Sequence, residues 1–96
     1  MTSVDLLPGA CRDFDESFDW YAARSPTAAL HYANAVDAAL ANIAASPRQF
    51  GPVDDEHWQY PLKRFPFRIV YRVLVDRILV VAIAHTSRRP GYWKDR

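Results

Sequence analysis

The segment 67–85 is apolar apart from a few charged positions that recur on one face of an extended chain. Two apolar runs, 67–75 and 78–85, flank Asp76 and Arg77, and this arrangement predicts a β-hairpin. If the chain turns about Asp76 and Arg77 with an even-numbered loop, the numbers of cross-strand partners sum to 153. That register places Arg68 directly opposite His85.

The same register divides the hairpin into two faces. One face interleaves Arg68, Arg72 and His85 with Val70, Leu74, Leu79, Val81 and Ile83. The other face carries no charge and consists of Phe67, Ile69, Tyr71, Val73, Val75, Ile78, Val80, Ala82 and Ala84. We expect the uncharged face to form the core, with room for helices over its two alanines. The Arg68 face should then be open to solvent, where recognition or chemistry can take place.

Two segments ahead of the hairpin have the period of amphipathic helices. A short β-prone opening, Ser3 to Leu7, is ended by Pro8-Gly9. From Ala10, an apolar stripe recurs at three- and four-residue spacing: Cys11, Phe14, Phe18 and Tyr21. The opposite side is polar: Arg12, Asp13, Asp15, Glu16 and Asp19. Ser25-Pro26 predicts the N-cap and first residue of a second helix, which ends near Ala45 because Ser46-Pro47 follows.

The remaining segments complete the expected fold. Residues 47–56 read as a polar loop, and a strand is expected from His57 to Arg64. We expect His31 and His57 to be solvated. The order strand, helix, helix, three strands predicts a single α+β domain spanning 1–96. In it, an antiparallel helical hairpin covers one face of a three-stranded antiparallel sheet.

Composition narrows the class of protein. The single cysteine, Cys11, excludes an internal disulfide and favours a reducing compartment, so we expect a cytoplasmic protein. The apolar run 69–84 is interrupted by charges and is too short to span a membrane. No Cys/His spacing suggests a metal site and no glycine-rich loop suggests a nucleotide, so we expect neither a metal nor a cofactor.

The net charge of +1 conceals two oppositely charged halves. Residues 1–56 contain three Lys and Arg against nine Asp and Glu, a balance of −6. Residues 57–96 contain nine against two, a balance of +7. This asymmetry indicates an acidic or polyanionic partner for the C-terminal half, or else an acidic helical layer that complements a basic sheet within one domain.

Three segments together resemble toxins of the RelE/ParE superfamily from bacterial type II toxin–antitoxin systems. They are Leu62 to Tyr71, Asp76-Arg77-Ile78, and His85 to Trp93, with Trp20-Tyr21 and the Ser25 to Ala29 junction in agreement. The resemblance implies a small antiparallel sheet backed by a helical hairpin. It also implies a hetero-oligomer with a cognate antitoxin, whose acidic, partly disordered C-terminal segment wraps the toxin. Family members act either on messenger RNA at the ribosome or on DNA gyrase.

The resemblance assigns candidate roles to individual residues. In the RNA-cleaving branch an active-site arginine corresponds to Arg68, and a basic residue beyond the last strand corresponds to Arg88 by its spacing. His85 and Tyr92 are the nearest equivalents of the histidine or tyrosine that completes the site. Cleavage by the 2′-hydroxyl needs a base, an acid and cations at the phosphate, and an Arg68–His85 pair could supply two of these.

This chain also departs from the RNA-cleaving branch. Its lysine-rich stretch is reduced to Lys63-Arg64, and a net charge of +1 is low for docking into ribosomal RNA. We therefore favour a ParE-like gyrase poison over a RelE-like ribosome-dependent mRNA endonuclease. A non-catalytic interaction module is the third reading, so whether the chain is an enzyme stays open.

The other basic and aromatic residues are candidates for binding the target or the antitoxin. They are Lys63, Arg64, Arg72, Arg89 and Trp93. Arg72 could hold an antitoxin carboxylate or touch the cellular target. Tyr92 and Trp93 are expected to pack back over the sheet in preference to stacking on bases. The simplest alternative for Arg68 and His85 is a polar pair that closes the sheet edge.

Overall fold

The computed structural model describes residues 2–96 and contains two helices and five strands. In chain order they are β1 (Ser3–Leu6), α1 (Pro8–Arg24), α2 (Pro26–Ala45), β2 (Gly51–Pro52), β3 (Trp58–Pro61), β4 (Phe67–Val73) and β5 (Arg77–His85). The α+β class and the order of the expected elements are confirmed. No helix within residues 2–96 is long and apolar enough to cross a membrane.

All five strands belong to one sheet in the order β1-β5-β4-β3-β2. The predicted three antiparallel strands are β3, β4 and β5. The sheet is extended at both edges, because β1 pairs with β5 in parallel and the two residues of β2 pair with β3. The polar loop expected at 47–56 therefore contains a short strand. The expected strand from His57 to Arg64 is limited to Trp58–Pro61.

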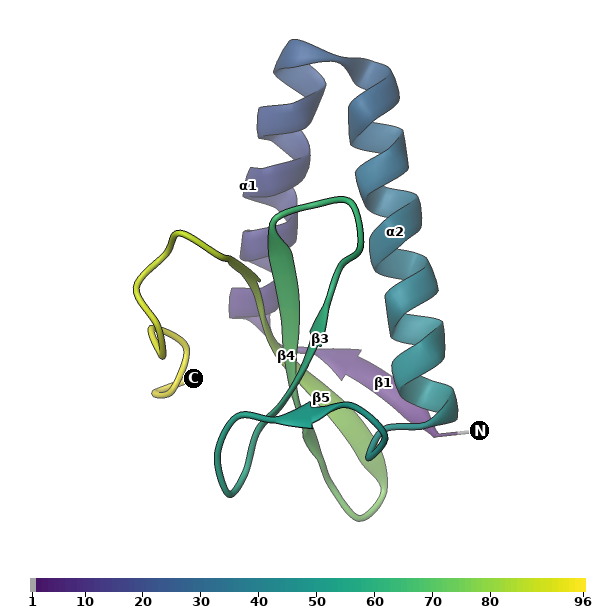
Figure 1. Ribbon diagram of the computed structural model, residues 1–96, viewed down its shortest axis with the longest axis vertical. Helices are drawn as coiled ribbons and strands as arrows, with labels where there is room; N and C mark the ends of the chain where they lie inside the picture. Colours follow the sequence, from purple (N-terminus) through teal and green to yellow (C-terminus); the bar gives the residue numbers. More distant parts are fainter. Residues whose placement is uncertain (1) are drawn as a thin grey trace.

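A single residue joins the two helices. The Ser25 N–H donates to the Tyr21 carbonyl at 2.7 Å and so closes α1, while its Oγ accepts from the Ala28 N–H at 3.2 Å and caps α2. With so short a connection the helices must run antiparallel, and Figure 1 shows them side by side with their turn beyond the sheet. The first helix begins at Pro8 and not at Ala10, because proline suits the first helical position.

The main core lies between the helical hairpin and one face of the sheet. It combines Tyr32, Val36 and Ile43 of α2 with Ile69 and Tyr71 of β4, all at most 3% exposed. Tyr32 also packs against aromatic rings from α1, β4 and the preceding loop, with centroids 5.2 to 5.6 Å away. This cluster fixes the helices against the sheet.

The register of the β4–β5 hairpin differs from the prediction. Val73 pairs with Ile78 and the Leu74 N–H donates to the Arg77 carbonyl, so the turn is Val75-Asp76. A β-bulge follows, because Val70 pairs with Ala82 while its neighbour Tyr71 pairs with Val80. Arg68 consequently stands opposite Ala84, and His85 stands opposite Phe67. The predicted Arg68–His85 pair is wrong.

The bulge at Val81 also exchanges the faces of the rest of β5. Ile83 joins the helix-side core, and the His85 ring packs edge-on to Phe67 at 4.9 Å. Ala82 and Ala84 lie instead on the opposite face with Val70, in a second cluster that Trp93 covers. The assignment of Ala82 and Ala84 to the helix side was therefore wrong.

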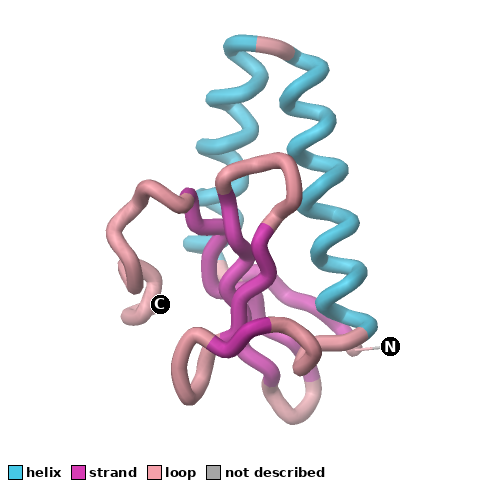
Figure 2. The backbone as a smooth tube through the Cα atoms, viewed as in Figure 1, coloured by secondary structure: helices cyan, strands magenta, loops and turns pink. Residues whose placement is uncertain are grey.

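The Arg68 face is not open, because the chain after β5 folds over it. Figure 2 shows this stretch as loop throughout. Trp93 is 5% exposed against the sheet and Tyr92 packs beside it, which confirms that this pair packs back onto the sheet. His57, expected to be solvated, is buried against Trp93, with ring centroids 4.7 Å apart. His31 is exposed, as expected.

A turn of acidic loop residues holds His57 in place. The Asp54 carboxylate accepts from the N–H groups of Glu56 and His57, and its Oδ1 lies 2.9 Å from His57 Nδ1. These contacts, led by the Glu56 N–H, lower the pKa of Asp54. The His57 ring held in this way packs against the Trp93 ring, and this contact helps to fix the C-terminal segment on the sheet.

Candidate functional site

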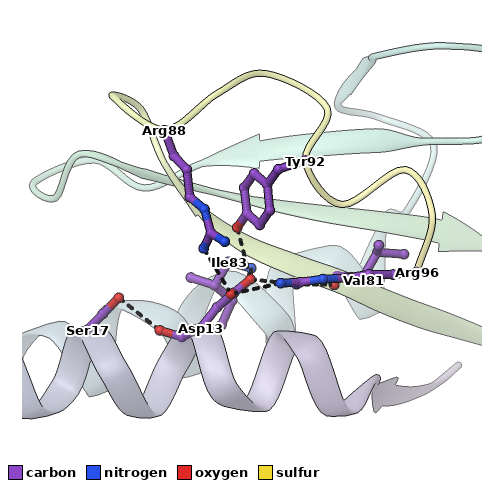
Figure 3. A network of polar contacts seen from close by, with 7 residues as sticks. All are labelled: Asp13, Ser17, Val81, Ile83, Arg88, Tyr92 and Arg96. Atoms are coloured by element: carbon purple, nitrogen blue, oxygen red, sulfur yellow. Dashed lines mark hydrogen bonds and ion pairs between the residues drawn. The ribbon is translucent and has the colours of Figure 1, made fainter.

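Asp13 of α1 is a buried carboxylate that the helical pattern placed on the polar side. Its Oδ2 accepts from the Ile83 N–H at 3.1 Å, the Tyr92 hydroxyl at 3.0 Å and Arg96 Nη1 at 2.7 Å. Its Oδ1 accepts from Arg96 Nη2 at 3.1 Å. Figure 3 shows these groups converging on Asp13 from β5 and the C-terminal segment. Three residues of the expected apolar stripe, Phe14, Phe18 and Tyr21, pack against the core as predicted, whereas Cys11 is exposed.

The position of Asp13 follows from the length of β1. This strand ends at Leu6, paired with Val80, so the outer edge of β5 has no strand beside it from Val81 onward. Arg96 Nη1 donates to the Val81 carbonyl at 3.0 Å, and Asp13 accepts from the Ile83 N–H. Two side chains therefore satisfy the backbone groups that a longer β1 would have paired. They also fasten the C-terminal segment to α1.

Tyr92 is a structural part of this network. Arg88 Cζ lies 3.6 Å from its ring centroid and Arg96 Cζ lies 5.0 Å away. Burial, together with the charge of Asp13 and the hydrogen bond to it, raises the pKa of Tyr92 to about 12. The hydrogen bond to Asp13 raises the pKa of Arg96, while partial burial opposes the shift. At neutral pH the Tyr92 hydroxyl is therefore a neutral donor that is already engaged.

We expect the free energy of unfolding to fall as the pH rises from 10 to 12. Tyr32, Tyr71 and Tyr92 each have a pKa of about 12 in the folded chain against 10 for a free tyrosine, chiefly because of burial. Their neutral form is favoured by folding, so this stability is complete below pH 10 and is lost as the pH passes through 12. Urea unfolding at pH 9, 10.5 and 11.5 measures it, and Tyr92→Phe should weaken the dependence. An unfolding midpoint that stays constant over this range would contradict the assignment.

Gly9 allows Arg96 to approach α1. A Cβ at this position would lie 2.6 Å from Arg96 Nε and 2.7 Å from its Cζ. Glycine to alanine in a helix ordinarily stabilises by up to about 1 kcal/mol. We expect Gly9→Ala to give no such gain, because Arg96 must leave Asp13 to make room.

The matched control is Gly9→Ala in an Arg96→Ala background, where the crowding group is absent. There the ordinary stabilisation should return, as measured by the midpoint of thermal unfolding. Equal effects of Gly9→Ala in the two backgrounds would show that Arg96 does not constrain Gly9.

A hollow of about 180 Å³, here called the basic pocket, lies where β5 meets the C-terminal segment. Six predicted site residues line it, together with Gln59, Ala84 and Lys94: Arg68, His85, Arg88, Arg89, Tyr92 and Trp93. Arg68 and His85 therefore share a pocket although they are not cross-strand partners. The structure brings together the four candidate catalytic residues.

The cations of the basic pocket have few anionic partners. Arg68 Nη1 donates to the neutral Gln59 Oε1 at 2.9 Å. Within residues 2–96, Arg89 and Lys94 form no ion pair. The His85 Nδ1 accepts from the Ser87 N–H at 3.0 Å and lies 2.7 Å from Ser87 Oγ. Such a set of guanidinium and ammonium groups can bind a carboxylate or a phosphate.

His85 and Arg88 also line a second hollow of about 390 Å³ between α1 and the end of the sheet. Its walls include Trp20, Tyr21 and Phe67, and Trp20 is 53% exposed. The two residues therefore stand between an aromatic hollow and the basic pocket.

Three other predicted residues lie apart from the basic pocket. Lys63 and Arg64 line a hollow of about 450 Å³ between α2 and the loop before β4. Arg72 Nη2 lies 3.9 Å from Glu56 Oε2. Within residues 2–96, no group of three or more His, Cys, Asp or Glu residues could hold a metal ion.

Comparison with known proteins agrees with the fold. Residues 4–90 match the family model described as the ParE toxin of the type II toxin–antitoxin system parDE. The chain therefore belongs to the ParE family, and it is the toxin component of such a system, with an antitoxin as its partner. No curated protein matches the chain.

A solved structure titled "Chromosomal ParDE TA system from P. aeruginosa" has the same fold. The two chains superpose with a TM-score of 0.80 at 22% identity, over 91% of this chain and 98% of the other. The last six residues, which include Tyr92, Trp93 and Arg96, lie beyond the part that the family model matches.

Proposed function

We propose that the protein inhibits growth by poisoning DNA gyrase in the cytoplasm and that its cognate antitoxin neutralises it. Membership of the ParE family supports this direction. The target would contact the basic pocket, where Arg88 and Arg89 are exposed and Arg68 is half-buried.

The hydrogen bond from the Tyr92 hydroxyl to Asp13 is the main observation in favour of a mechanism without RNA cleavage. RNA cleavage needs groups that can take and give a proton near neutral pH. The Tyr92 hydroxyl donates to Asp13 and has a pKa of about 12, so it is a poor proton acceptor at neutral pH. His85 has no cross-strand arginine beside it, because it pairs with Phe67. The arrangement supports a binding surface more than an acid–base pair.

The antitoxin would bind the hollow between α2 and the loop before β4. Ala35, Ala39, Leu62 and Phe65 contribute apolar surface there, and Lys63 and Arg64 contribute positive charge. An acidic amphipathic segment fits a groove of that composition. The sheet face around Val70 and Val81 is not available to such a segment, because the C-terminal segment already covers it.

Induced expression with two readouts tests the proposed target. We expect growth arrest accompanied by DNA-damage signalling and an unchanged pattern of messenger RNA ends in primer extension. Coexpression of the antitoxin should restore growth. Discrete cuts within codons, without DNA damage, would overturn the proposal in favour of a ribosome-dependent ribonuclease.

The ribonuclease stays the second candidate because of one observation. Arg68, His85 and Arg88 line the same small pocket, so a phosphate could contact cations and an imidazole together. A ribosome-bound cleavage assay with His85→Ala separates the two functions, since only a ribonuclease would lose discrete cuts in that variant.

A further inference from the structure

Two arginines face one carboxylate at the wall of the basic pocket. Arg96 binds Asp13 with two parallel hydrogen bonds of 2.7 and 3.1 Å. Arg88 Nη1 stands 3.5 Å from Asp13 Oδ1, which is an ion pair but too long for a good hydrogen bond. The Arg88 side chain is 48% exposed and that of Arg96 is 20% exposed.

The hydrogen bonds to Asp13 are shared unequally between its two oxygens. An ionised carboxylate offers about four lone-pair positions. Oδ2 accepts from Ile83, Tyr92 and Arg96 Nη1, whereas Oδ1 accepts only from Arg96 Nη2. Arg88 therefore faces the oxygen with the fewer donors, but its Nη1 stays 3.5 Å away and its Cζ lies 3.6 Å from the Tyr92 ring centroid.

The charges of Asp13 and its two arginines explain why Arg88 is not drawn closer. Asp13, with a side chain 4% exposed, needs a paired cation because an isolated buried charge is costly. Arg96 supplies that cation, so the second guanidinium is surplus to the pair. Arg88 lines the basic pocket with this surplus charge, whereas Arg96 is not among the residues that line it.

We propose that Arg96 is a positioning residue that neutralises Asp13 and thereby keeps the Arg88 guanidinium available to an anionic group in the basic pocket. Without Arg96, Asp13 Oδ1 would lose its only hydrogen-bond donor and the carboxylate would lose its paired cation. Arg88 is the nearest remaining cation, and it would move from 3.5 Å into direct hydrogen bonds with Asp13. The pocket would then lose a cation although none of its lining residues had changed.

Phenylglyoxal labelling of the purified protein measures the availability of Arg88 directly, because the dicarbonyl reagent condenses with free guanidinium groups. Mass spectrometry of the Arg88 peptide gives the rate. We expect Arg96→Met to slow labelling of Arg88 at least fivefold. Asp13→Asn combined with Arg96→Met should restore the original rate, since the neutral amide no longer attracts Arg88. Arg48→Met removes one positive charge outside the basic pocket and should leave the rate unchanged.

The double variant separates positioning from a structural role. If Arg96 merely holds the C-terminal segment in place, both Arg96→Met and the double variant will label at the same altered rate, and the proposal fails. Unchanged labelling in Arg96→Met overturns it as well. If Arg96→Met does not fold, Arg96→Lys tests the same point. A lysine donates from a single nitrogen, leaves one oxygen vacant and should slow labelling by a smaller factor.

A growth assay of the same variants extends the test to the proposed function. The expected growth results rest on that proposed function. We expect Arg96→Met to lose growth inhibition as Arg88→Ala does, and the double variant to recover it. If labelling follows the expected order while growth inhibition does not, the positioning role stands and the role of Arg88 at the target is wrong.

Discussion

Ile69→Ala is expected to lower the free energy of unfolding by about 2–5 kcal/mol, the range for removing most of a fully buried aliphatic side chain. Ile69 is 0% exposed in the centre of β4, where it pairs with Ile83 and faces the helical hairpin. The cavity cannot close easily, because the aromatic cluster around Tyr32 holds the helices at a fixed separation. A loss of this size is a large fraction of the stability of a small domain.

Thermal and urea unfolding of the purified chain measure this effect. The matched control is Val75→Ala, which removes apolar atoms from a fully exposed turn residue and should leave the melting temperature unchanged. Growth inhibition by Ile69→Ala should fail through unfolding, and the antitoxin should then no longer be retained. An Ile69→Ala variant that melts like the unsubstituted chain would mean that the sheet does not pack against the helices as described.

Arg68→Ala and Arg88→Ala are expected to abolish growth inhibition while leaving the fold intact. Truncating a charge that is buried on binding costs roughly 2 kcal/mol or more, which is about 30-fold in affinity. The cost to stability should be about 1 kcal/mol or less, because Arg68 binds a neutral glutamine and Arg88 makes a partly exposed ion pair of 3.5 Å.

Parallel growth curves and thermal melts of the same variants decide this prediction. Arg48→Ala is the matched control, since Arg48 is exposed in the loop after α2 and lies outside the basic pocket. It should remain fully toxic. If Arg68→Ala and Arg88→Ala also stay toxic while charge reversal at Asp15 or Glu16 removes toxicity, the active surface is α1 and the site is misassigned.

The helical hairpin could be predicted from the sequence because local chemistry determines it. Ser25-Pro26 supplies a cap and a first helical residue at one point, and the structure uses Ser25 to end one helix and begin the next. The α+β class followed from the order of the elements. The start of α1 was missed by two residues because Pro8 was taken as a breaker, whereas proline is tolerated in the first turn.

The register of the β-hairpin could not be predicted in the same way. Residues 78–84 are all apolar, so this stretch has no alternation of polar and apolar residues that an extra residue at Val81 would interrupt. Moving one residue out of register transfers every later side chain to the opposite face. That single bulge accounts for the wrong pairing of Arg68 with His85 and for the exchanged positions of Ala82 and Ile83.

Asp13 was missed because its partners are distant in sequence. Ile83, Tyr92 and Arg96 follow it by 70, 79 and 83 residues, so no local pattern connects them. One signal was present, however. Gly9 and Ala10 lie just before Asp13 at the start of the helix, and small residues there permit the close approach of another segment. A polar residue next to such positions is a candidate for a buried contact.

Incubation of the purified toxin with purified DNA gyrase, ATP and supercoiled plasmid tests whether the chain poisons gyrase. The proposed function predicts that linear, gyrase-cleaved plasmid accumulates with the unsubstituted chain and with Arg48→Ala. It should not accumulate with Arg68→Ala or Arg88→Ala, or after addition of the antitoxin. Unchanged gyrase activity and no cleaved plasmid at any concentration of the folded toxin would show that the chain does not poison gyrase.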